Sequence, residues 1–484
     1  MTGSVRRRVD PVVVLVVVLA IPVLVIGALR SRIDTSSAAS DPVVSQVPGS
    51  PVPDVVEPAL SFRRLASEFA TQTALVDLGS ALAPVVAGLG DRSCLAVSVG
   101  GVPVPGLVDR PTIPASSLKI LVATAALEVL GPEHRFVTTV MGASPVGGVV
   151  DGDIVIVGGG DPLLSGDWYP TSNLDRFPVM THTSLDALAR SLGAAGVTEV
   201  RGRVLGDATR YDDEWYAPDW DADIRGIEAG PFAALLANDA RVEGDPYRGD
   251  DPVRAATEEF SLRLAAAGIA VAGPGGSGLM TSGMVELARI ESVPLVDVVA
   301  EMLTTSDNNT AELLVKEIGV ATSGNGTRVD GLAGVAEALD RLGVPVGDLQ
   351  LVDGSGLASG NIVRCSTLVG ALEVAHPAVR EGLAILGRSG TLTGVLADHP
   401  LAGAVAAKTG TLNNFPSDAD PPAVKAFAGA WDPGSGAAVV RFALVLNAPT
   451  VSDQSEYRPL WIGLLDAVAA VPASEAVTAI GPRR

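Results

Sequence analysis

Two residues, three positions apart, could act together as a nucleophile and its base. Ser116 and Lys119 form an S-x-x-K pattern at the start of an apolar segment, directly after Pro114 and Ala115. Positions i and i+3 lie on one face of a helix. A lysine that is desolvated near a helix N-terminus can lose its proton and activate a serine hydroxyl. The pattern therefore indicates acyl transfer through Ser116, although taken alone it equally fits an N-cap serine followed by an ordinary lysine.

Lysine is rare in this chain. Among 34 lysines and arginines, only Lys119, Lys316, Lys408 and Lys425 are lysines. Arginine does not release its proton near neutral pH, whereas a desolvated lysine does. Where the chain has lysine instead of arginine, the site can require an amine that titrates or a compact ammonium. We expect such a requirement at Lys119 and Lys408. We expect Lys316 and Lys425 to be ordinary surface charges.

A second polar pattern, Ser306-Asp307-Asn308, falls in a break between two predicted helices. Such a break can direct the hydroxyl of Ser306 and the amide of Asn308 into a cleft. The same residues also fit the N-cap of the helix that follows, because Ser, Asp and Asn are preferred there. The pattern by itself leaves both interpretations open.

A third pattern, Lys408-Thr409-Gly410-Thr411, lies in the segment VAAKTGTL. Its alternation predicts an edge strand, and Gly410 would let a substrate backbone approach the strand closely. The alternative is a surface strand that ends in a turn. Lys408 supplies a cation, and Thr409 and Thr411 supply hydroxyls on one face of the strand.

The three patterns need elements that position them. Helical spacing of apolar residues predicts a helix over 116–131, and a helix, a break and a second helix over 294–319. Near the end of the chain, 425–433 and 438–449 predict a hairpin, followed by a final helix within 450–471. Helices combined with a late antiparallel hairpin predict an α+β fold, in which helices cover an antiparallel sheet.

Taken together, the patterns resemble a known superfamily. The order S-x-x-K, S-D-N, K-T-G is typical of penicillin-binding proteins and class A β-lactamases. Ser306 follows Ser116 by 306 − 116 = 190 residues, and this long insertion resembles the penicillin-binding protein 4 group of D-Ala-D-Ala carboxypeptidase/endopeptidases, peptidase family S13. Further segments from about residue 61 to 470 look like that family: Pro114-Ala115-Ser116, 158–162 (GGGDP), Gly206-Asp207, 231–238 (PFAALLAN), Ala311-Glu312 and 353–357 (DGSGL).

The resemblance implies a role for each matching residue. Ser116 would be the nucleophile and Lys119 the base, while the backbone N–H groups of Ser116 and Thr411 would hold the oxyanion. Ser306 would relay a proton to the leaving amine. The remaining positions would bind substrate: Asn308 the peptide backbone, and Lys408, Thr409 and Thr411, with Gly410 between them, the terminal carboxylate.

The resemblance also implies a function and its partners. The expected enzyme is a serine D-Ala-D-Ala carboxypeptidase acting on peptidoglycan stem peptides, with cleavage of cross-links as a further activity, and it would be acylated by β-lactams. It requires no cofactor. A serine β-lactamase or esterase on the same scaffold, or a non-catalytic wall-binding protein, are the alternatives. Ser355 in D-G-S-G lacks the G-x-S-x-G spacing of an α/β-hydrolase, and we expect a turn packed beside the site.

The predicted domain order begins with a segment that targets the protein to the membrane. Residues 1–11, with Arg6, Arg7 and Arg8, would be a cytoplasmic tail, and the uncharged apolar residues 12–29 a transmembrane anchor. A cleaved signal peptide, giving a secreted protein, is the alternative. The rest of the chain would be a Pro/Ser-rich linker (30–60), a transpeptidase-like catalytic domain (61–145 and 285–484) and a smaller inserted region (146–284). Members of the resembled family usually carry two extra domains in this insertion. Because the insertion is short here, we expect one of the two to be missing or reduced.

Composition limits the other possibilities. The 484 residues are 47% hydrophobic and 18% charged, which is typical of a globular protein. A net charge of −21 excludes nucleic acid as an expected partner. Four histidines without metal-ligand spacing predict no metal site. Cys94 and Cys365 form either one disulfide, as exported proteins allow, or two buried thiols.

Overall fold

The computed structural model describes residues 73–413, 420–434 and 437–471. Every described residue belongs to one compact unit of the chain, Phe62–Arg484. The predicted tail (1–11), anchor (12–29) and linker (30–60) therefore lie outside the described residues. Among the described helices, none combines the length and the apolar character needed to cross a bilayer.

The largest sheet has six strands in the order β13-β14-β15-β16-β1-β2, and all its pairings are antiparallel. In this sheet, β1 and β2 come from the beginning of the described chain and the other four strands from its end. The two parts meet where Cys94 lies opposite Val445. The strands are β1 (Cys94–Val99), β2 (Val102–Pro103), β13 (Ala384–Ile385), β14 (Val405–Leu412), β15 (Ala423–Trp431) and β16 (Val440–Ala448). The predicted hairpin is confirmed as β15 and β16.

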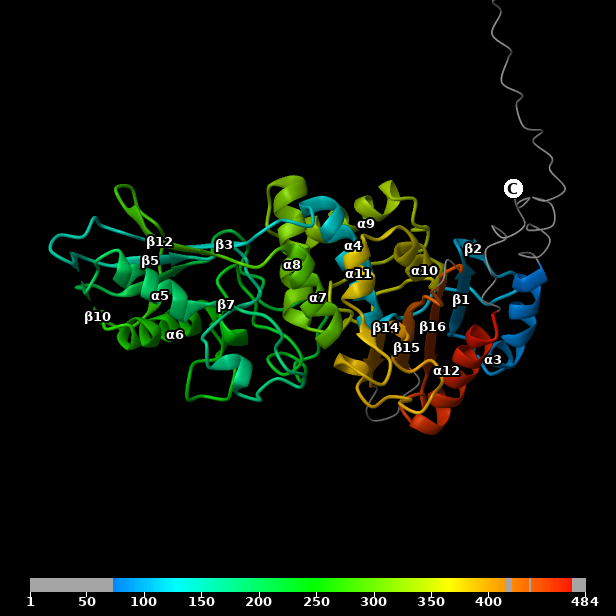
Figure 1. Cartoon of the computed structure of the whole chain (residues 1–484). Helices are drawn as coiled ribbons and strands as arrows, with labels where there is room; N and C mark the ends of the chain where they lie inside the picture. Colours follow the sequence, from blue (N-terminus) through cyan, green and yellow to red (C-terminus); the bar gives the residue numbers. More distant parts are fainter. Residues whose placement is uncertain (1–72, 414–419, 435–436, 472–484) are drawn as a thin grey trace, which may run out of the picture. The chain divides into compact units, whose positions relative to one another are not determined.

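Helices cover both faces of this sheet (Figure 1). On one face lie α4 (Lys119–Leu130), α7 (Leu295–Thr305), α8 (Asn308–Ser323), α9 (Arg328–Arg341), α10 (Cys365–Val374) and α11 (Pro377–Glu381). On the other lie α3 (Ala83–Ala87) and α12 (Gln454–Ala469). Residues 119–127 of α4 are all buried, as expected of a helix that is apolar on every side. The predicted α+β class, with helices over an antiparallel sheet, is confirmed.

A second group of sheets forms between α4 and α7. Five strands follow the order β11-β9-β5-β3-β12, three follow β10-β8-β4, and β6 pairs with β7. Their bounds are β3 (Val137–Gly142), β4 (Val149–Val150), β5 (Ile154–Val157), β6 (Leu164–Ser165), β7 (Thr183–Ser184), β8 (Glu199–Val200), β9 (Val204–Asp207), β10 (Ala270–Val271), β11 (Gly276–Ser277) and β12 (Val285–Glu291). Helices α5 (Leu185–Ala194) and α6 (Pro252–Ala266) pack on them.

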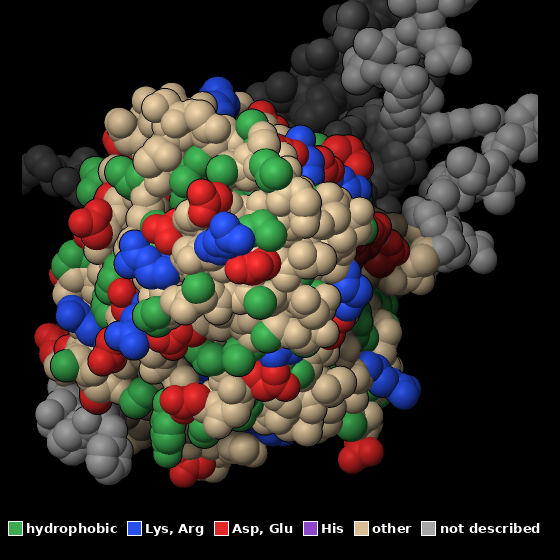
Figure 2. Space-filling view, turned by 90° about the vertical axis from the view of Figure 1, so that its left-hand side faces the viewer, with side chains coloured by type: hydrophobic (Ala, Val, Ile, Leu, Met, Phe, Trp, Pro, Cys, Tyr) green, Lys and Arg blue, Asp and Glu red, His purple; other side chains and the backbone are tan. Residues whose placement is uncertain are grey.

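The strands β3 and β12 connect this group to the rest of the chain. They pair with each other along most of their length, and β3 also pairs with β5. The inserted region was predicted as 146–284. β3 ends just before this range and β12 begins just after it, yet both strands belong to the same sheet as β5, which lies inside the range. Figure 2 shows the face of this end of the molecule, where acidic and basic side chains are interspersed.

A disulfide joins Cys94 on β1 to Cys365 at the start of α10, with 5.9 Å between the two Cα atoms. It links the sheet to a helix packed on its face, across 271 residues of sequence. Of the two possibilities for these cysteines, the structure therefore contains the disulfide.

Candidate active site

The predicted nucleophile lies in a single 3₁₀ turn, η1 (Ala115–Leu118), immediately before α4. Ala115 has a φ of +47°, a conformation that residues other than glycine rarely adopt and that is concentrated at functional sites. Lys119 Nζ lies 3.1 Å from Ser116 Oγ. The N-cap of α4 is Leu118, without a side-chain cap. Ser116 is therefore not an N-cap residue, and its hydroxyl faces the lysine.

Lys119 is fully buried and has three oxygen neighbours. Besides Ser116 Oγ, its Nζ contacts Asn308 Oδ1 at 2.7 Å and the carbonyl oxygen of Ser355 at 2.6 Å. Burial disfavours the ammonium and lowers the pKa of Lys119 to about 8, although carboxylates nearby, Asp353 first, act in the opposite direction. A large fraction of this amine is thus neutral at mildly alkaline pH, and it lies within reach of a serine proton.

A buried carboxylate fixes the carbonyl that contacts Lys119. Glu312, on α8, accepts hydrogen bonds from the backbone N–H groups of Gly354 at 3.0 Å and of Ser355 at 2.7 Å. Burial, and then the charge of Asp353, raise the pKa of Glu312 to about 7. Asp353 accepts from Gly356 N at 2.8 Å. The D-G-S-G turn is therefore held from two sides, with its Ser355 carbonyl directed at Lys119.

Ser306 and Lys408 form a second pair. Ser306 ends α7 with a φ of +67°, and Lys408 Nζ donates to its Oγ at 2.7 Å. Asp307 is the residue that caps α8, by accepting from Thr310 N. Burial lowers the pKa of Lys408, and the positive charge of Lys119 lowers it further. The S-D-N segment therefore caps a helix and also presents a hydroxyl to the site, so both interpretations of the sequence hold.

Strand β14 brings the K-T-G residues against η1. β13 pairs with β14 only at Ala406 and Ala407, which leaves residues 408–412 without a strand on that side. A Cβ on Gly410 would lie 2.7 Å from the carbonyl oxygen of Pro114. Glycine is therefore needed because β14 passes close to the turn that carries the nucleophile, rather than only for substrate access as predicted. Thr409 Oγ1 lies 3.0 Å from Thr391 Oγ1.

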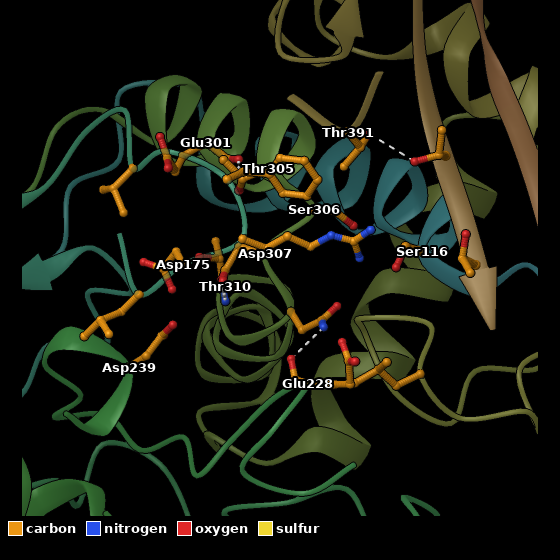
Figure 3. A pocket seen from close by; sticks show the side chains of 18 of the residues that line it. Ser116, Asp175, Glu228, Asp239, Glu301, Thr305, Ser306, Asp307, Thr310 and Thr391 are labelled. Atoms are coloured by element: carbon orange, nitrogen blue, oxygen red, sulfur yellow. Dashed lines mark hydrogen bonds between the residues drawn. The ribbon is translucent and has the colours of Figure 1, made fainter. Parts of the chain in front are cut away.

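Five of the predicted site residues line a cavity of about 680 Å³: Ser116, Ser306, Asn308, Thr409 and Thr411. In Figure 3, Ser116 and Ser306 lie toward one end of it and Asp175 and Asp239 at the other. Asn308 Nδ2 donates to the backbone oxygen of Glu228 at 2.8 Å, so the inserted region supplies part of the wall next to the nucleophile. The structure thus brings all eight predicted site residues to one region: Ser116, Lys119, Ser306, Asn308, Lys408, Thr409, Gly410 and Thr411.

The model of the D-Ala-D-Ala carboxypeptidase 3 (S13) family matches residues 107–250 and 236–464. The chain belongs to this family. A D-alanyl-D-alanine carboxypeptidase of Actinomadura sp. (strain R39) is 31% identical over 387 residues, which cover 62% of this chain and 69% of that protein. Carboxypeptidase DacB of Mycolicibacterium smegmatis is 30% identical over 464 residues, 91% of this chain and 94% of that protein.

The fold comparison agrees with the S13 assignment. Penicillin binding protein 4 (dacB) of Haemophilus influenzae superposes with a TM-score of 0.62 at 20% identity, over 80% of this chain and 98% of that one. The same protein complexed with a β-lactam superposes with a TM-score of 0.60. This likeness confirms the predicted penicillin-binding, transpeptidase-like fold.

Two lysines differ from their predicted surface role. Lys316 is fully buried on α8, where its Nζ contacts Asp212 Oδ1 at 2.5 Å and lies 5.2 Å from the Phe232 ring centroid. Lys425 is half-buried and lines the cavity. The predictions for both were wrong because sequence gives no burial for an isolated lysine. The position of Lys316 directly after the apolar run 313–315 is the one local signal that could have indicated burial.

The sequence also missed two groups that act on Lys119. The Ser355 turn was expected only to pack beside the site, and Glu312 entered the prediction only as part of a segment that resembles the family. Their contacts join residues far apart in sequence, such as 119 and 355. Among the described residues, no group of three or more His, Cys, Asp or Glu side chains is arranged to hold a metal ion.

Proposed function

We propose that this protein is a serine D-alanyl-D-alanine carboxypeptidase that also cleaves peptidoglycan cross-links through an acyl-enzyme on Ser116. One observation carries the mechanism: a fully buried lysine amine, with its pKa lowered to about 8, lies 3.1 Å from the Ser116 hydroxyl. The family assignment supplies the substrate class. The relative from Actinomadura is a D-alanyl-D-alanine carboxypeptidase by name.

The first step forms the ester. Ser116 Oγ attacks the carbonyl carbon between the two terminal D-alanines, and Lys119 Nζ takes the hydroxyl proton. The backbone N–H groups of Ser116 and Thr411 would hold the negative oxygen that develops on the carbonyl. The C–N bond then breaks, and the leaving amine takes up a proton. Ser306 relays that proton, since its Oγ lies 2.7 Å from Lys408 Nζ.

The remaining predicted site residues would bind the substrate. The terminal carboxylate would accept hydrogen bonds from the hydroxyls of Thr409 and Thr411, next to the positive charge of Lys408. Asn308 would hold the backbone of the stem peptide that is cut. Water then attacks the ester carbonyl, which releases the shortened peptide and restores the Ser116 hydroxyl. A β-lactam would acylate Ser116 by the same attack, with its ring amide bond breaking in place of the peptide bond.

We propose further that the protein is anchored in the cell membrane through residues 12–29, with its catalytic domain outside the cytoplasm, or secreted if that segment is cleaved. The disulfide between Cys94 and Cys365 supports an oxidising compartment. Cell fractionation tests this: the full chain should sediment with membranes and a chain starting at residue 30 should not. Recovery of the full chain in the cytosol would contradict both forms of the proposal.

The mechanism is tested with a fluorescent penicillin. The full chain should take up a covalent label that survives denaturation, and the Ser116→Ala variant should take up none. Rapid turnover of a chromogenic cephalosporin without stable label would favour the β-lactamase alternative. A folded protein that neither keeps a label nor consumes a β-lactam would leave the non-catalytic wall-binding alternative.

A further inference from the structure

One side of the cavity carries positive charge that the hydrolysis itself does not use. We call Lys425, Arg176 and Arg458 the cationic corner. All three line the cavity and come from separate elements: β15, the loop after η2 (Tyr169–Thr171), and α12. Lys425 lies directly opposite Thr411 in the β14–β15 register, and its Nζ donates to Thr411 Oγ1 at 3.3 Å. The corner therefore begins where the K-T-G strand would hold the terminal carboxylate.

The protein does not neutralise these charges with its own carboxylates. No salt bridge joins Lys425, Arg176 or Arg458 to an Asp or Glu within residues 73–413, 420–434 and 437–471. The chain has 55 acidic residues and a net charge of −21, so carboxylates are plentiful elsewhere. After burial, the nearby charge of Arg176 is the second cause that lowers the pKa of Lys425. Like charges are thus gathered without compensation, which an anionic ligand would relieve.

Two buried donors beside these charges also lack acceptors. Arg458 Nε and Trp461 Nε1 are buried, find no hydrogen-bond partner in the described part of the chain, and belong to residues that line the cavity. Aromatic rings hold the corner in place. The ring centroid of Tyr457 lies 5.2 Å from Lys425 Nζ and 6.0 Å from Arg458 Cζ, while Trp461 stacks on Phe427. The arrangement offers fixed donors to a ligand that is rich in acceptors.

The acidic residues at the far end of the cavity differ from this corner. Asp175 accepts from the Tyr169 hydroxyl at 3.0 Å, and Glu301 accepts from Met180 N at 3.1 Å (Figure 3 shows both carboxylates). These carboxylates are bonded within the protein and hold the loop 169–180 against α7. Among the described residues, these two carboxylates therefore have partners from the protein, whereas the cationic corner has no carboxylate partner.

We propose that the cationic corner is a leaving-group subsite for the acceptor stem peptide of a cross-link. This rests on the proposed function, in which Thr409 and Thr411 hold the carboxylate next to the scissile bond. A leaving D-alanine has only the carboxylate held by Thr409 and Thr411, and it has no second carboxylate to place against Arg176 and Arg458. An acceptor stem carries further free carboxylates along its chain, and a cavity of about 680 Å³ has room for a peptide. The corner therefore favours endopeptidase over carboxypeptidase cleavage.

The chemistry of this cleavage balances without a co-reactant other than water. The Ser116 Oγ–carbonyl bond forms and the C–N bond of the cross-link breaks. The acceptor amine leaves with a proton from Ser306, which the proton that Lys119 took from Ser116 replaces. Water then attacks the ester: its oxygen bonds to the acyl carbon, the Ser116 Oγ–carbonyl bond breaks, and one proton of the water restores the Ser116 hydroxyl. The corner takes part in no bond change. It binds the leaving peptide and so determines which amide is cut.

The test compares three substrates on the full chain: a pentapeptide monomer, a cross-linked dimer with free carboxylates, and the same dimer in which every carboxylate of the acceptor stem is amidated except the one next to the scissile bond. In the Lys425→Met and Arg458→Gln variants, the ratio of kcat/KM for the free dimer to that for the pentapeptide should fall about tenfold, as expected for one lost charge-assisted interaction. Amidation should lower the same ratio in the unchanged protein. Lys425→Arg should restore it.

Arg341→Gln is the matched control, because Arg341 is an exposed arginine on α9 outside the cavity, and it should leave the ratio unchanged. Equal losses on dimer and pentapeptide would overturn the proposal, since Lys425 would then act on the terminal carboxylate alone. Equal cleavage of free and amidated dimers would also overturn it. A full chain that takes no penicillin label would instead overturn the proposed function itself.

Discussion

The two ends of the K-T-G segment, Lys408 and Thr411, lie in surroundings that are built in opposite ways. At the nucleophile, both lysine amines have partners from the protein: Lys119 has three oxygen neighbours at 2.6–3.1 Å, and Lys408 donates to Ser306 and to the Thr409 carbonyl. In the cationic corner, the described residues give Lys425 only a hydroxyl and a ring as neighbours, and they give Arg458 Nε no acceptor. The first end is complete on folding, whereas the second is completed by a ligand.

This difference separates chemistry from selectivity. Lys119 and Lys408 are fully buried, and desolvation is the largest cause that lowers the pKa of each. Their properties thus depend on the protein interior and apply to every substrate. The corner is partly open to solvent, so its charges act on those ligands that reach it. Substitutions around the nucleophile should therefore slow the cleavage of all substrates alike. Substitutions in the cationic corner should change the rate on one substrate relative to another.

The largest effect is expected at the base. Lys119→Met removes the proton acceptor next to Ser116 and should slow acylation about 10²- to 10⁴-fold, the usual contribution of general base catalysis. The loss should be similar for penicillin, pentapeptide and cross-linked dimer, because each needs the same proton transfer. Labelling rates with a fluorescent penicillin, and kcat/KM for both peptides, measure it.

The chain offers a matched control in Lys316→Met. Lys316 is also fully buried, but its Nζ contacts Asp212 and lies over Phe232, away from the nucleophile. Its loss should lower Tm and leave the labelling rate of the folded protein within about twofold, since an ion pair is removed and no catalytic group is touched. Labelling of the Lys119→Met variant at the rate of the unchanged protein would contradict the assignment of Lys119 as the base.

Local sequence patterns predicted the elements around the site well. The helix expected over 116–131 is present as η1 followed by α4, and the expected break within 294–319 is present as Ser306 and Asp307 between α7 and α8. The hairpin over 425–433 and 438–449 is present as β15 and β16. These elements depend on apolar periodicity and on residues that end helices, which are properties of short segments.

Contacts between distant segments could not be predicted in this way. The carbonyl of Ser355 reaches Lys119 only because Glu312 and Asp353 hold its turn, and no spacing in the sequence encodes that arrangement. The rarity of lysine was informative, yet it did not distinguish roles. Lys316 proved to be a buried structural cation and Lys425 a cavity residue, because burial depends on how the helices and strands pack.

The pH dependence of acylation should separate the two ends with a smaller but specific effect. Lys119 must be neutral to accept the serine proton, and its pKa is lowered from 10.5 to about 8. Acylation should therefore rise with pH to a plateau, with a midpoint near 8, and fall about tenfold per unit at lower pH as the amine becomes protonated. The rate constant for penicillin labelling, measured across pH, gives the midpoint.

Charges at the first end should move this midpoint, and charges in the corner should not. The carboxylates of Glu312 and Asp353 raise the pKa of Lys119, so Glu312→Gln should shift the midpoint to lower pH. The corner residues are not among the groups that determine this pKa, so Arg458→Gln should keep the midpoint while it changes the preference between dimer and pentapeptide. A shift in Arg458→Gln equal to that in Glu312→Gln would contradict the separation, because the corner would then act on the base rather than on the leaving peptide.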